Sequence, residues 1–274
     1  TAVLPWYTTW QNCKDGVNIM SDVLYGRNAV REALRAGRRS FQRLLVSSGA
    51  QEAGTLGEVV KLAEKSGVAV TRVERQELDR RLRDANHQGV ALECGPYPYA
   101  ELSDCLALAE ARHEPALLLL LDHLQDPQNV GTLLRTAEIV GAHGVILPGR
   151  RAAEITPAVV NASSGATEHL QVVVVSNLAQ AIGELQKAGV WVIGVEDDER
   201  AQEFDRADLD MPLALVIGAE GPGLARLTRE RCDFLIKLPM RGQIASFNAA
   251  VAGSIVLYHA WRMRSPRSTP KVTT

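Results

Sequence analysis

Three segments in the second half of the chain contain the polar side chains and glycines that ligand sites use. The first, residues 122–135, reads as a loop followed by a helix, with Asn129 predicted as the N-cap. On that helix Arg135 shares a face with Gln128, Gly131 and Thr132, so its guanidinium can reach back toward the loop. A capped helix that carries a solvated arginine is the alternative interpretation.

The same loop contains Asp122, His123 and Asp126, which are residue types that bind metal ions. However, Asp-Pro and Asn are also common turn residues. No Cys-x-x-Cys pair with zinc-ligand spacing occurs anywhere in the chain. We therefore predict no metal site.

The second segment has the sequence Gly-Ala-Glu-Gly-Pro-Gly-Leu over residues 218–224. Its three glycines allow the backbone to pass close to a ligand, and Glu220 adds a carboxylate at a strand end. The dinucleotide-binding pattern does not fit, because Glu220 stands where that pattern requires its second glycine, and the chain has no Walker-type Gly-Lys-Ser/Thr. A plain turn followed by a helix remains the alternative.

The third segment, residues 238–252, runs from Leu-Pro-Met into an alanine-rich helix. We predict Ser246 as the N-cap of that helix. A role for Ser246 as a hydrolase nucleophile is disfavoured, because no Gly-x-Ser-x-Gly elbow surrounds it. The small residues Ala249, Ala250, Ala252 and Gly253 make one end of the helix narrow enough for close packing.

These segments follow strands of a predicted parallel sheet. Near-continuous apolar runs, typical of strands that are covered on both faces, occur at 117–121, 144–147, 172–175, 191–195, 213–217 and 234–238. Helical stretches alternate with them at 129–140, 154–163, 177–188, 223–231 and 246–264. In such a sheet ligands bind beyond the carboxyl ends of the strands, which is where the three segments lie.

The first half of the chain predicts a small α/β domain over residues 23–95. Helices are expected at 26–36, 56–66 and 75–82, and strands at 43–47, 68–73 and 89–93. Residues 96–114, with a short helix at 102–111, are predicted as a linker to the second domain at 115–266. Residues 1–22 and 267–274 are predicted tails, and Met20 is a plausible true start.

Composition sets the class of protein. The 274 residues are 46% hydrophobic and 23% charged, which is ordinary for a globular protein, and the longest purely apolar run, residues 116–121, is too short to cross a membrane. The four scattered cysteines indicate no disulfide scaffold. Together with the absence of a signal-peptide pattern in the first twenty residues, they lead us to expect a cytoplasmic protein.

Basic side chains are concentrated in the first domain. Residues 21–96 have a net charge of +3 and residues 115–266 a net charge of −4. Arg27, Arg31 and Arg35 lie on one face of the first predicted helix, and Arg38, Arg39 and Arg43 follow. This cluster is suited to phosphates, so a polyanion should prefer this domain. A solvated face, weakened as an anion site by Glu32, is the alternative.

Taken together and in this order, the three segments resemble the motifs of the SPOUT-class methyltransferases, specifically the SpoU (TrmH/RlmB-like) RNA ribose 2′-O-methyltransferases. Phe247 stands where the family usually has leucine. Two segments of the first half, 25–30 and 86–91, look like the ends of the family's small substrate-binding domain, and residues 162–166 resemble a further segment of the ribosomal-RNA members. The resemblance covers about residues 23–264. The matching motif residues are Asn129 and Arg135; Gly218–Leu224; and Ile236, Leu238, Pro239, Met240, Ser246 and Asn248.

The resemblance implies a C-terminal α/β domain with a deep trefoil knot, S-adenosylmethionine as the cofactor, RNA as the substrate and a homodimer. Given this resemblance, we predict that the arginine cluster of the first domain contacts RNA phosphates, through Arg27, Arg31, Arg35, Arg38 and Arg39. The implied catalytic residues are Arg135, Asn129, Glu220, Ser246 and Asn248. Because an arginine has a pKa above about 12, we expect Arg135 to bind a phosphate and the developing alkoxide rather than act as a base. The implied cofactor-binding residues are Gly194, Val195, Gly218, Glu220, Gly221, Ile236, Leu238, Met240, Ser246, Phe247 and Asn248.

Among the family's targets, a guanosine of 23S ribosomal RNA is the expected one. Transfer RNA and antibiotic-resistance sites in ribosomal RNA are alternatives. Two other classes of protein remain open from the residues: a non-catalytic RNA-binding module that assists ribosome assembly, and a small-molecule enzyme that uses a nucleotide. The proton acceptor for the target hydroxyl is not identified by the resemblance.

Overall fold

The chain forms two compact units, which the computed structural model divides as Thr1–Pro98 and Tyr99–Thr274. The structure describes residues 22–83, 85–149, 152, 154–244 and 246–264. The predicted tails lie outside these residues except for Asp22, which begins the first strand.

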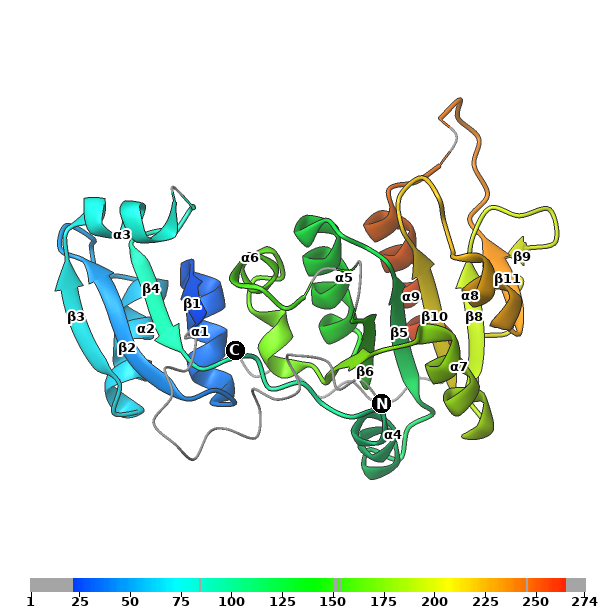
Figure 1. The fold of residues 1–274 in the computed structure, drawn as a ribbon, viewed down its shortest axis with the longest axis horizontal. Helices are drawn as coiled ribbons and strands as arrows, with labels where there is room; N and C mark the ends of the chain where they lie inside the picture. The colour runs from blue at the N-terminus through cyan, green and yellow to red at the C-terminus, as the bar shows by residue number, and fades with distance from the viewer. Residues whose placement is uncertain (1–21, 84, 150–151, 153, 245, 265–274) are drawn as a thin grey trace. The chain divides into compact units, whose positions relative to one another are not determined.

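The first unit is a four-stranded sheet with three helices (Figure 1). Strand order is β1-β4-β2-β3, with β2 parallel to β3 and β4 antiparallel to β1 and β2. Helix α1 packs against α2, and Leu78 of α3 packs against Leu45 and Ala91 of the sheet. The elements are β1 (Asp22–Tyr25), α1 (Arg27–Ala36), β2 (Phe41–Ser47), α2 (Thr55–Lys65), β3 (Ala69–Val73), α3 (Arg75–Leu82) and β4 (Val90–Cys94).

Strand β1 was not predicted from the sequence, whereas the three helices and the other three strands were. The strand has only four residues and is defined by antiparallel pairing with β4, in which Asp22 lies opposite Cys94. Local periodicity cannot reveal a strand this short, because its partner is about seventy positions away in the sequence. The sheet of the first unit therefore has four strands and not the expected three, and the additional strand β1 lies at its edge.

The second unit is the predicted parallel sheet covered by helices on both faces. Its order is β7-β6-β5-β10-β8-β11-β9, and every pairing is parallel. The short edge strand β9 is the only addition to the six predicted strands among the residues described. The strands are β5 (Leu117–Asp122), β6 (Gly144–Pro148), β7 (Val172–Val175), β8 (Trp191–Val195), β9 (Gln202–Glu203), β10 (Leu213–Gly218) and β11 (Phe234–Lys237).

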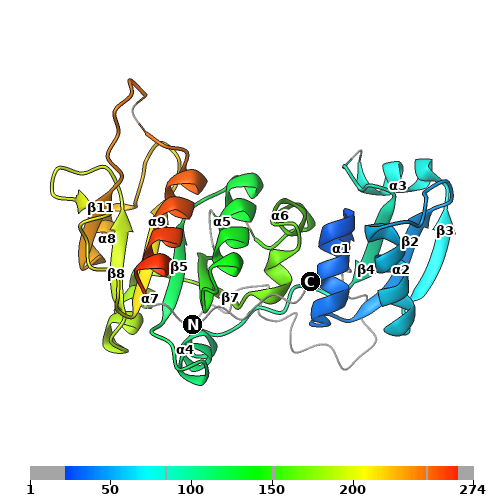
Figure 2. The same ribbon diagram turned by 180° about the vertical axis from the view of Figure 1, so that it is seen from behind.

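Helices α5 and α9 lie side by side on one face of this sheet (Figures 1 and 2). Gly253 of α9 makes the approach possible, because a Cβ there would lie 2.6 Å from a Leu133 methyl carbon. Helix α6 packs on α5, α4 and α7 cover the other face, and α8 packs on α7. The elements are α4 (Leu102–Ala111), α5 (Pro127–Ile139), α6 (Pro157–Ala162), the 3-10 helix η2 (Ala166–His169), α7 (Leu178–Lys187), α8 (Arg226–Arg231) and α9 (Ala249–Met263).

Residues 99–114 are part of the second unit, so the predicted linker is wrong over this stretch. Cys105 and Ala109 of α4 are buried in the same core as Leu118 and Leu120 of β5. The backbone N–H of Ala100 also donates to the carbonyl of Val172 at 2.8 Å. Apolar contacts at three- and four-residue spacing along α4 hold it against the sheet, whereas a linker would be solvated.

Arg264, the last residue described, bonds the end of α9 to the segments at the amino-terminal ends of two strands. Its guanidinium donates to the carbonyl oxygens of Pro115 at 2.6 Å, Ala116 at 3.0 Å and Met211 at 2.8 Å. Burial lowers the pKa of Arg264 to about 10. These bonds join α9 to the segments that precede β5 and β10.

Within the residues that the structure describes, none of the helices has the length and apolar character needed to cross a membrane.

Candidate active site

The candidate site lies at the carboxyl ends of β5 and β10, which are neighbours in the sheet. Asp122 at the end of β5 pairs in register with Gly218 at the end of β10. From β5 the chain continues to β6 and β7 on one side, while β10 and β8 lie on the other. Such a reversal of strand order opens a crevice between the loops, which is the usual ligand site of parallel α/β sheets.

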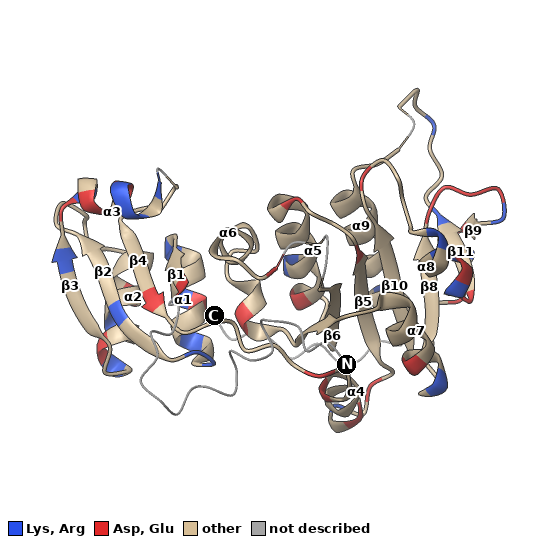
Figure 3. Cartoon of the chain, in the orientation of Figure 1, with Lys and Arg blue, Asp and Glu red and all other residues tan. Residues whose placement is uncertain are grey.

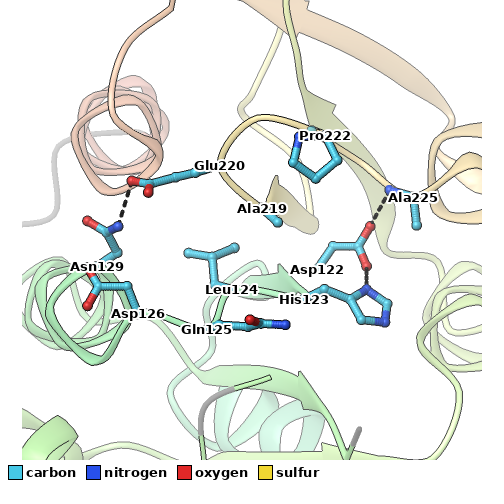
Figure 4. A pocket seen from close by; sticks show the side chains of 11 residues that line it. Asp122, His123, Leu124, Gln125, Asp126, Asn129, Ala219, Glu220, Pro222 and Ala225 are labelled. Carbon is cyan, nitrogen blue, oxygen red and sulfur yellow. Dashed lines mark hydrogen bonds and ion pairs between the residues drawn. The ribbon is translucent and has the colours of Figure 1, made fainter. Parts of the chain in front are cut away.

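Three polar side chains from the three predicted segments meet here. The amide nitrogens of Asn129 and Asn248 each donate to Glu220 Oε1 at 2.6 Å, and the Asn248 amide also lies 3.0 Å from Asn129 Oδ1. Figure 4 shows the bond between Asn129 and Glu220. One carboxylate thus connects α5, the loop after β10 and the start of α9.

Both predicted N-caps are wrong, and the correction explains this cluster. Asp126 caps α5, with its carboxylate accepting from the backbone N–H of Gln128 at 3.1 Å and Pro127 in the first helical turn. Asn129 lies within the first turn, where its amide is directed to Glu220. Asn248, not Ser246, caps α9: its Oδ1 accepts from the backbone N–H groups of two following residues.

The loop after β10 is a tight turn that requires glycine. The backbone N–H of Gly223 donates to the carbonyl of Ala219 at 3.0 Å, and Gly221 and Gly223 have φ values of 82° and 69°. A Cβ at Gly218 would lie 2.3 Å from the carbonyl carbon of Gly223. The glycine spacing therefore fixes the position of Glu220, which lies within the turn.

One side of this turn borders a cavity of about 430 Å³, named here the β11 cavity. Nine of the eleven predicted cofactor residues line it: Val195, Gly218, Glu220, Gly221, Leu238, Met240, Ser246, Phe247 and Asn248. Gly194 and Ile236 do not. A Cβ at Gly194 would lie 2.6 Å from a Leu235 methyl carbon, so this glycine serves packing, and Ile236 is fully buried.

Sequence reasoning missed several residues that line the β11 cavity, among them Glu196, Asp197 and Lys237. Glu196 is paired with Arg229 at 2.6 Å, and the ammonium of Lys237 donates to the carbonyl of Asp198 at 3.1 Å. Asp197 is exposed. Glu196 and Asp197 follow β8, and Lys237 is the last residue of β11. The rule that ligands bind at the carboxyl ends of strands could therefore have identified them from the sequence.

The other side of the turn borders a second cavity of about 570 Å³, named here the β5 cavity (Figure 4). Its polar lining comes from the loop after β5 and from Glu220, and the apolar side chains of Leu124, Ala219 and Pro222 complete it. Glu220 lines both cavities. The Asn129–Glu220–Asn248 cluster therefore lies where the two cavities meet.

Arg135 is not brought into either cavity. It lies farther along α5 with an exposed side chain, and its Nη1 donates to Ser164 Oγ at 3.3 Å. Ser164 has a φ of 56° and follows α6, which packs closely on α5 at Gly131. The structure thus joins the predicted segment at 162–166 to Arg135, a contact that sequence reasoning did not identify.

Figure 3 shows Lys and Arg residues in blue on the elements of the first unit. The arginines predicted to bind RNA divide by burial into two groups. The side chain of Arg39 is fully buried, forms an ion pair with Asp22 at 2.8 Å and lies 5.0 Å from the centre of the Tyr97 ring. A buried guanidinium cannot reach a phosphate, so this part of the prediction is wrong.

The other predicted arginines are at least partly accessible. Arg31 and Arg35 form ion pairs with Glu32 and Glu58, and Arg43 pairs with Glu93 at 2.9 Å. The backbone N–H and the guanidinium of Arg27 donate to Gln88, and the guanidinium of Arg38 stacks near Tyr97. The surface is therefore less positive than the spacing of its arginines indicates.

No group of three or more His, Cys, Asp or Glu side chains among the described residues is arranged to hold a metal ion.

Comparison with known proteins places this architecture in a family. Residues 116–258 match the SpoU rRNA methylase family, and residues 23–100 match the RNA 2′-O ribose methyltransferase substrate-binding domain. YacO of Bacillus subtilis, described as a TrmH family tRNA/rRNA methyltransferase, is 43% identical over 89% of this chain and 97% of its own length. A Staphylococcus aureus relative with the same family description is 41% identical over 88% of this chain and 96% of its own.

Solved structures agree with this assignment. The SpoU methyltransferase AviRb of Streptomyces viridochromogenes is 25% identical, with a TM-score of 0.72 over 89% of this chain and 90% of its own. An rRNA methyltransferase of Sinorhizobium meliloti is 26% identical, with a TM-score of 0.72 over 89% and 88% of the two chains. From its two matched domains and its full-length relatives, the chain belongs to the SpoU rRNA methylase family.

Proposed function

We propose that the chain transfers the methyl group of S-adenosylmethionine to the 2′-hydroxyl of a ribose in RNA, with a guanosine of 23S ribosomal RNA as the target. The class of enzyme, an RNA methyltransferase that uses S-adenosylmethionine, follows from family membership. The observation that carries the finer proposal is the Asn129–Glu220–Asn248 cluster at the junction of two cavities. One cavity suits the cofactor and the other the nucleotide.

The β11 cavity has the size and lining that S-adenosylmethionine requires. Its volume, about 430 Å³, lies within the usual range for cofactor sites. Leu238, Met240 and Phe247 offer apolar contacts to an adenine ring, and the glycines at 218 and 221 expose backbone N–H and C=O groups. The carboxylates of Asp197 and Glu220 match the positive charge that this cofactor carries.

When bound, S-adenosylmethionine supplies a methyl group on a positively charged sulfur. The chain's own residues position the acceptor. Glu220 fixes the two asparagine amides, and Asn248 uses both of its N–H groups and its oxygen within the protein. The second N–H of the Asn129 amide can orient a ribose at the junction of the two cavities. Ser246, exposed on the cavity wall, adds a hydroxyl for the same purpose. Arg135, held by Ser164, binds an RNA phosphate or the alkoxide charge.

RNA capture is assigned to the first unit, through Arg27, Arg31, Arg35 and Arg38. Because Arg31 and Arg35 face Glu32 and Glu58, a phosphate must compete with two carboxylates there. Charge reversal at Arg31 and Arg35 is expected to reduce the salt dependence of RNA binding. An unchanged dependence on salt would move the RNA contact elsewhere, for example to the exposed arginines Arg75 and Arg83 at the two ends of α3.

We also propose a homodimer that acts in the cytoplasm. Helix α9 has a run of exposed apolar side chains, Val251, Ile255, Tyr258 and Met263, and Ile139 is exposed on α5, the helix that packs against α9. A second copy of the chain would bury this face. Sedimentation of the purified protein tests it, with Ile255→Glu expected to shift the dimer to monomer. The trefoil knot stays a prediction.

The decisive experiment measures transfer of a labelled methyl group from S-adenosylmethionine to total RNA that lacks its own 2′-O-methyl marks. Label is expected in large-subunit ribosomal RNA and, after digestion to nucleosides, in 2′-O-methylguanosine. Arg135→Ala is expected to abolish the label, while Arg226→Ala, an exposed arginine paired only with Glu230 in the described structure, keeps it. Label found only in transfer RNA would show that transfer RNA, and not ribosomal RNA, is the substrate. Binding of S-adenosylmethionine without any label in RNA would refute the proposed reaction.

A further inference from the structure

His123 occupies an unusual place at the carboxyl end of β5. It follows the last residue of the strand, lines the β5 cavity, and has a φ of 62°, a left-handed backbone conformation that few non-glycine residues adopt. Its side chain is 41% exposed. The ring is therefore accessible from the cavity, and the fixed backbone limits the positions that it can take.

Asp122 orients this ring. Its side chain is only 1% exposed, and Oδ1 lies 2.5 Å from His123 Nδ1 while Oδ2 accepts from the backbone N–H of Ala225 at 2.7 Å. An ionised carboxylate can only accept hydrogen bonds, so Nδ1 carries the ring proton. The lone pair of the neutral ring is then on Nε2, the nitrogen that Asp122 does not engage.

The pair shares the β5 cavity with the Asn129–Glu220–Asn248 cluster. Figure 4 shows the Asp122–His123 pair on one side of the cavity and the Asn129–Glu220 bond on the other, with Leu124 and Ala219 between them. Since Glu220 also lines the β11 cavity, a ribose held at the junction has the methyl donor on one side. The imidazole is then on the other side.

The other ionisable groups around this cavity are poorly suited to accept a proton. Glu220 accepts two amide hydrogen bonds, and Asp126 caps α5. Nearby on α8, Arg229 pairs with Glu196 and Arg226 with Glu230, and burial raises the pKa of the neighbouring Cys232 thiol to about 12. The charged groups lining the cavity beside His123 are the carboxylates of Asp122, Asp126 and Glu220. Among the described lining residues none is a lysine or arginine.

We propose that His123 is the proton acceptor for the target 2′-hydroxyl, with Asp122 as its positioning residue. The inference rests on the proposed function. As the hydroxyl oxygen bonds to the methyl carbon, the carbon–sulfur bond breaks and leaves its electron pair on sulfur, which becomes a neutral thioether. The hydroxyl proton passes to His123 Nε2, and Asp122 stabilises the imidazolium that results.

The test compares two histidines of similar backbone geometry in single-turnover methyl transfer to unmethylated total RNA between pH 5.5 and 8.5. His123→Asn keeps a side chain that tolerates positive φ and removes the base. His113→Asn is the matched control, because His113 has a φ of 54° but precedes β5, whereas His123 follows it. Binding of S-adenosylmethionine to each variant is measured by calorimetry.

For the unaltered chain the rate is expected to rise with pH, because only a neutral imidazole can accept the proton. His123→Asn should lower the plateau rate by a factor of about 10² to 10⁴ and remove the pH dependence, with cofactor affinity unchanged. His113→Asn should retain both the rate and its pH dependence. In His123→Gly, added imidazole should restore part of the rate, an effect that a structural role of His123 does not predict.

Two results separate failure of this inference from failure of the proposed function. If His123→Asn keeps a rate within threefold of the unaltered chain, or keeps its pH dependence, His123 is not the proton acceptor although the chain is a methyltransferase. If the unaltered chain transfers no methyl group to RNA at any pH, the proposed function is refuted, and the inference fails with it.

Discussion

Gly131 is the point where α5 and α6 approach most closely, and its replacement tests how this packing holds Arg135. A Cβ at position 131 would lie 2.5 Å from the Cβ of Ala162 and 2.8 Å from the backbone nitrogen of Ser163. Ordinary carbon–carbon contacts are about 3.5–4.0 Å, so α6 must move away by about 1 Å. We therefore expect Gly131→Ala to destabilise the second unit.

The size of the effect follows from two opposing contributions. Alanine favours a helix over glycine by about 1 kcal/mol, whereas overpacking against rigid backbone costs up to about 3 kcal/mol. The expected net loss is about 2 kcal/mol. Gly183→Ala in α7 is the matched control, because the nearest atom to its Cβ is Nη1 of Arg231 at 3.7 Å. That variant should gain up to about 1 kcal/mol.

Urea unfolding of the two variants, followed by circular dichroism, measures the difference directly. Methyl transfer by folded Gly131→Ala should also fall, because movement of α6 separates Ser164 from Arg135. If Gly131→Ala is as stable as the unaltered chain, the close packing of α5 on α6 is not as described. An equal gain in unfolding free energy in Gly131→Ala and Gly183→Ala would also contradict this packing.

Three further perturbations have defined outcomes. Glu220→Gln removes the charge from two hydrogen bonds but keeps an acceptor, so kcat/KM for methyl transfer should fall about tenfold while the unfolding free energy changes by less than about 1 kcal/mol. Desolvation, followed by the charges of Arg112 and Arg264, lowers the pKa of buried His143 from 6.5 to about 4. Because the folded-state pKa is the lower one, stability is full above pH 6.5 and declines toward pH 4, by about 3 kcal/mol in urea titrations, and His143→Asn should remove this decline. Arg39→Met should leave RNA affinity unchanged and lower the unfolding free energy of the first unit by about 2 kcal/mol, because Asp22 loses its buried partner.

The sequence predicted the sheet and the loops of the site because both depend on local patterns. Continuous apolar runs define strands that are buried on both faces, and all six predicted strands of the second unit occur. Glycine spacing likewise identified the turn that holds Glu220. These signals lie within a few residues, so no long-range contact is needed to read them.

The errors arise where several residues compete for one role. Asp126 and Asn129 are both good N-caps, as are Ser246 and Asn248, and in each case the sequence reasoning selected the wrong one. For α5 the choice depends on a distant partner, because the amide of Asn129 is directed to Glu220. Similarly, the burial of Arg39 depends on Asp22 and Tyr97, which the spacing of the arginines does not reveal.

The bonds that Arg264 makes to the segments before β5 and β10 have a consequence for folding during translation. The central strand pair joins Leu117 to Leu213, and the carbonyls before both strands are bonded by Arg264. The chain leaves the ribosome from its N-terminus, so β6 soon follows β5, whereas β10, the other neighbour of β5 in the sheet, is synthesised only after most of the second unit. The first unit can fold during translation, whereas the apolar strand β5 stays without β10 and α9 until synthesis is almost complete. Its six buried residues are then the segment of the nascent chain most in need of protection from aggregation.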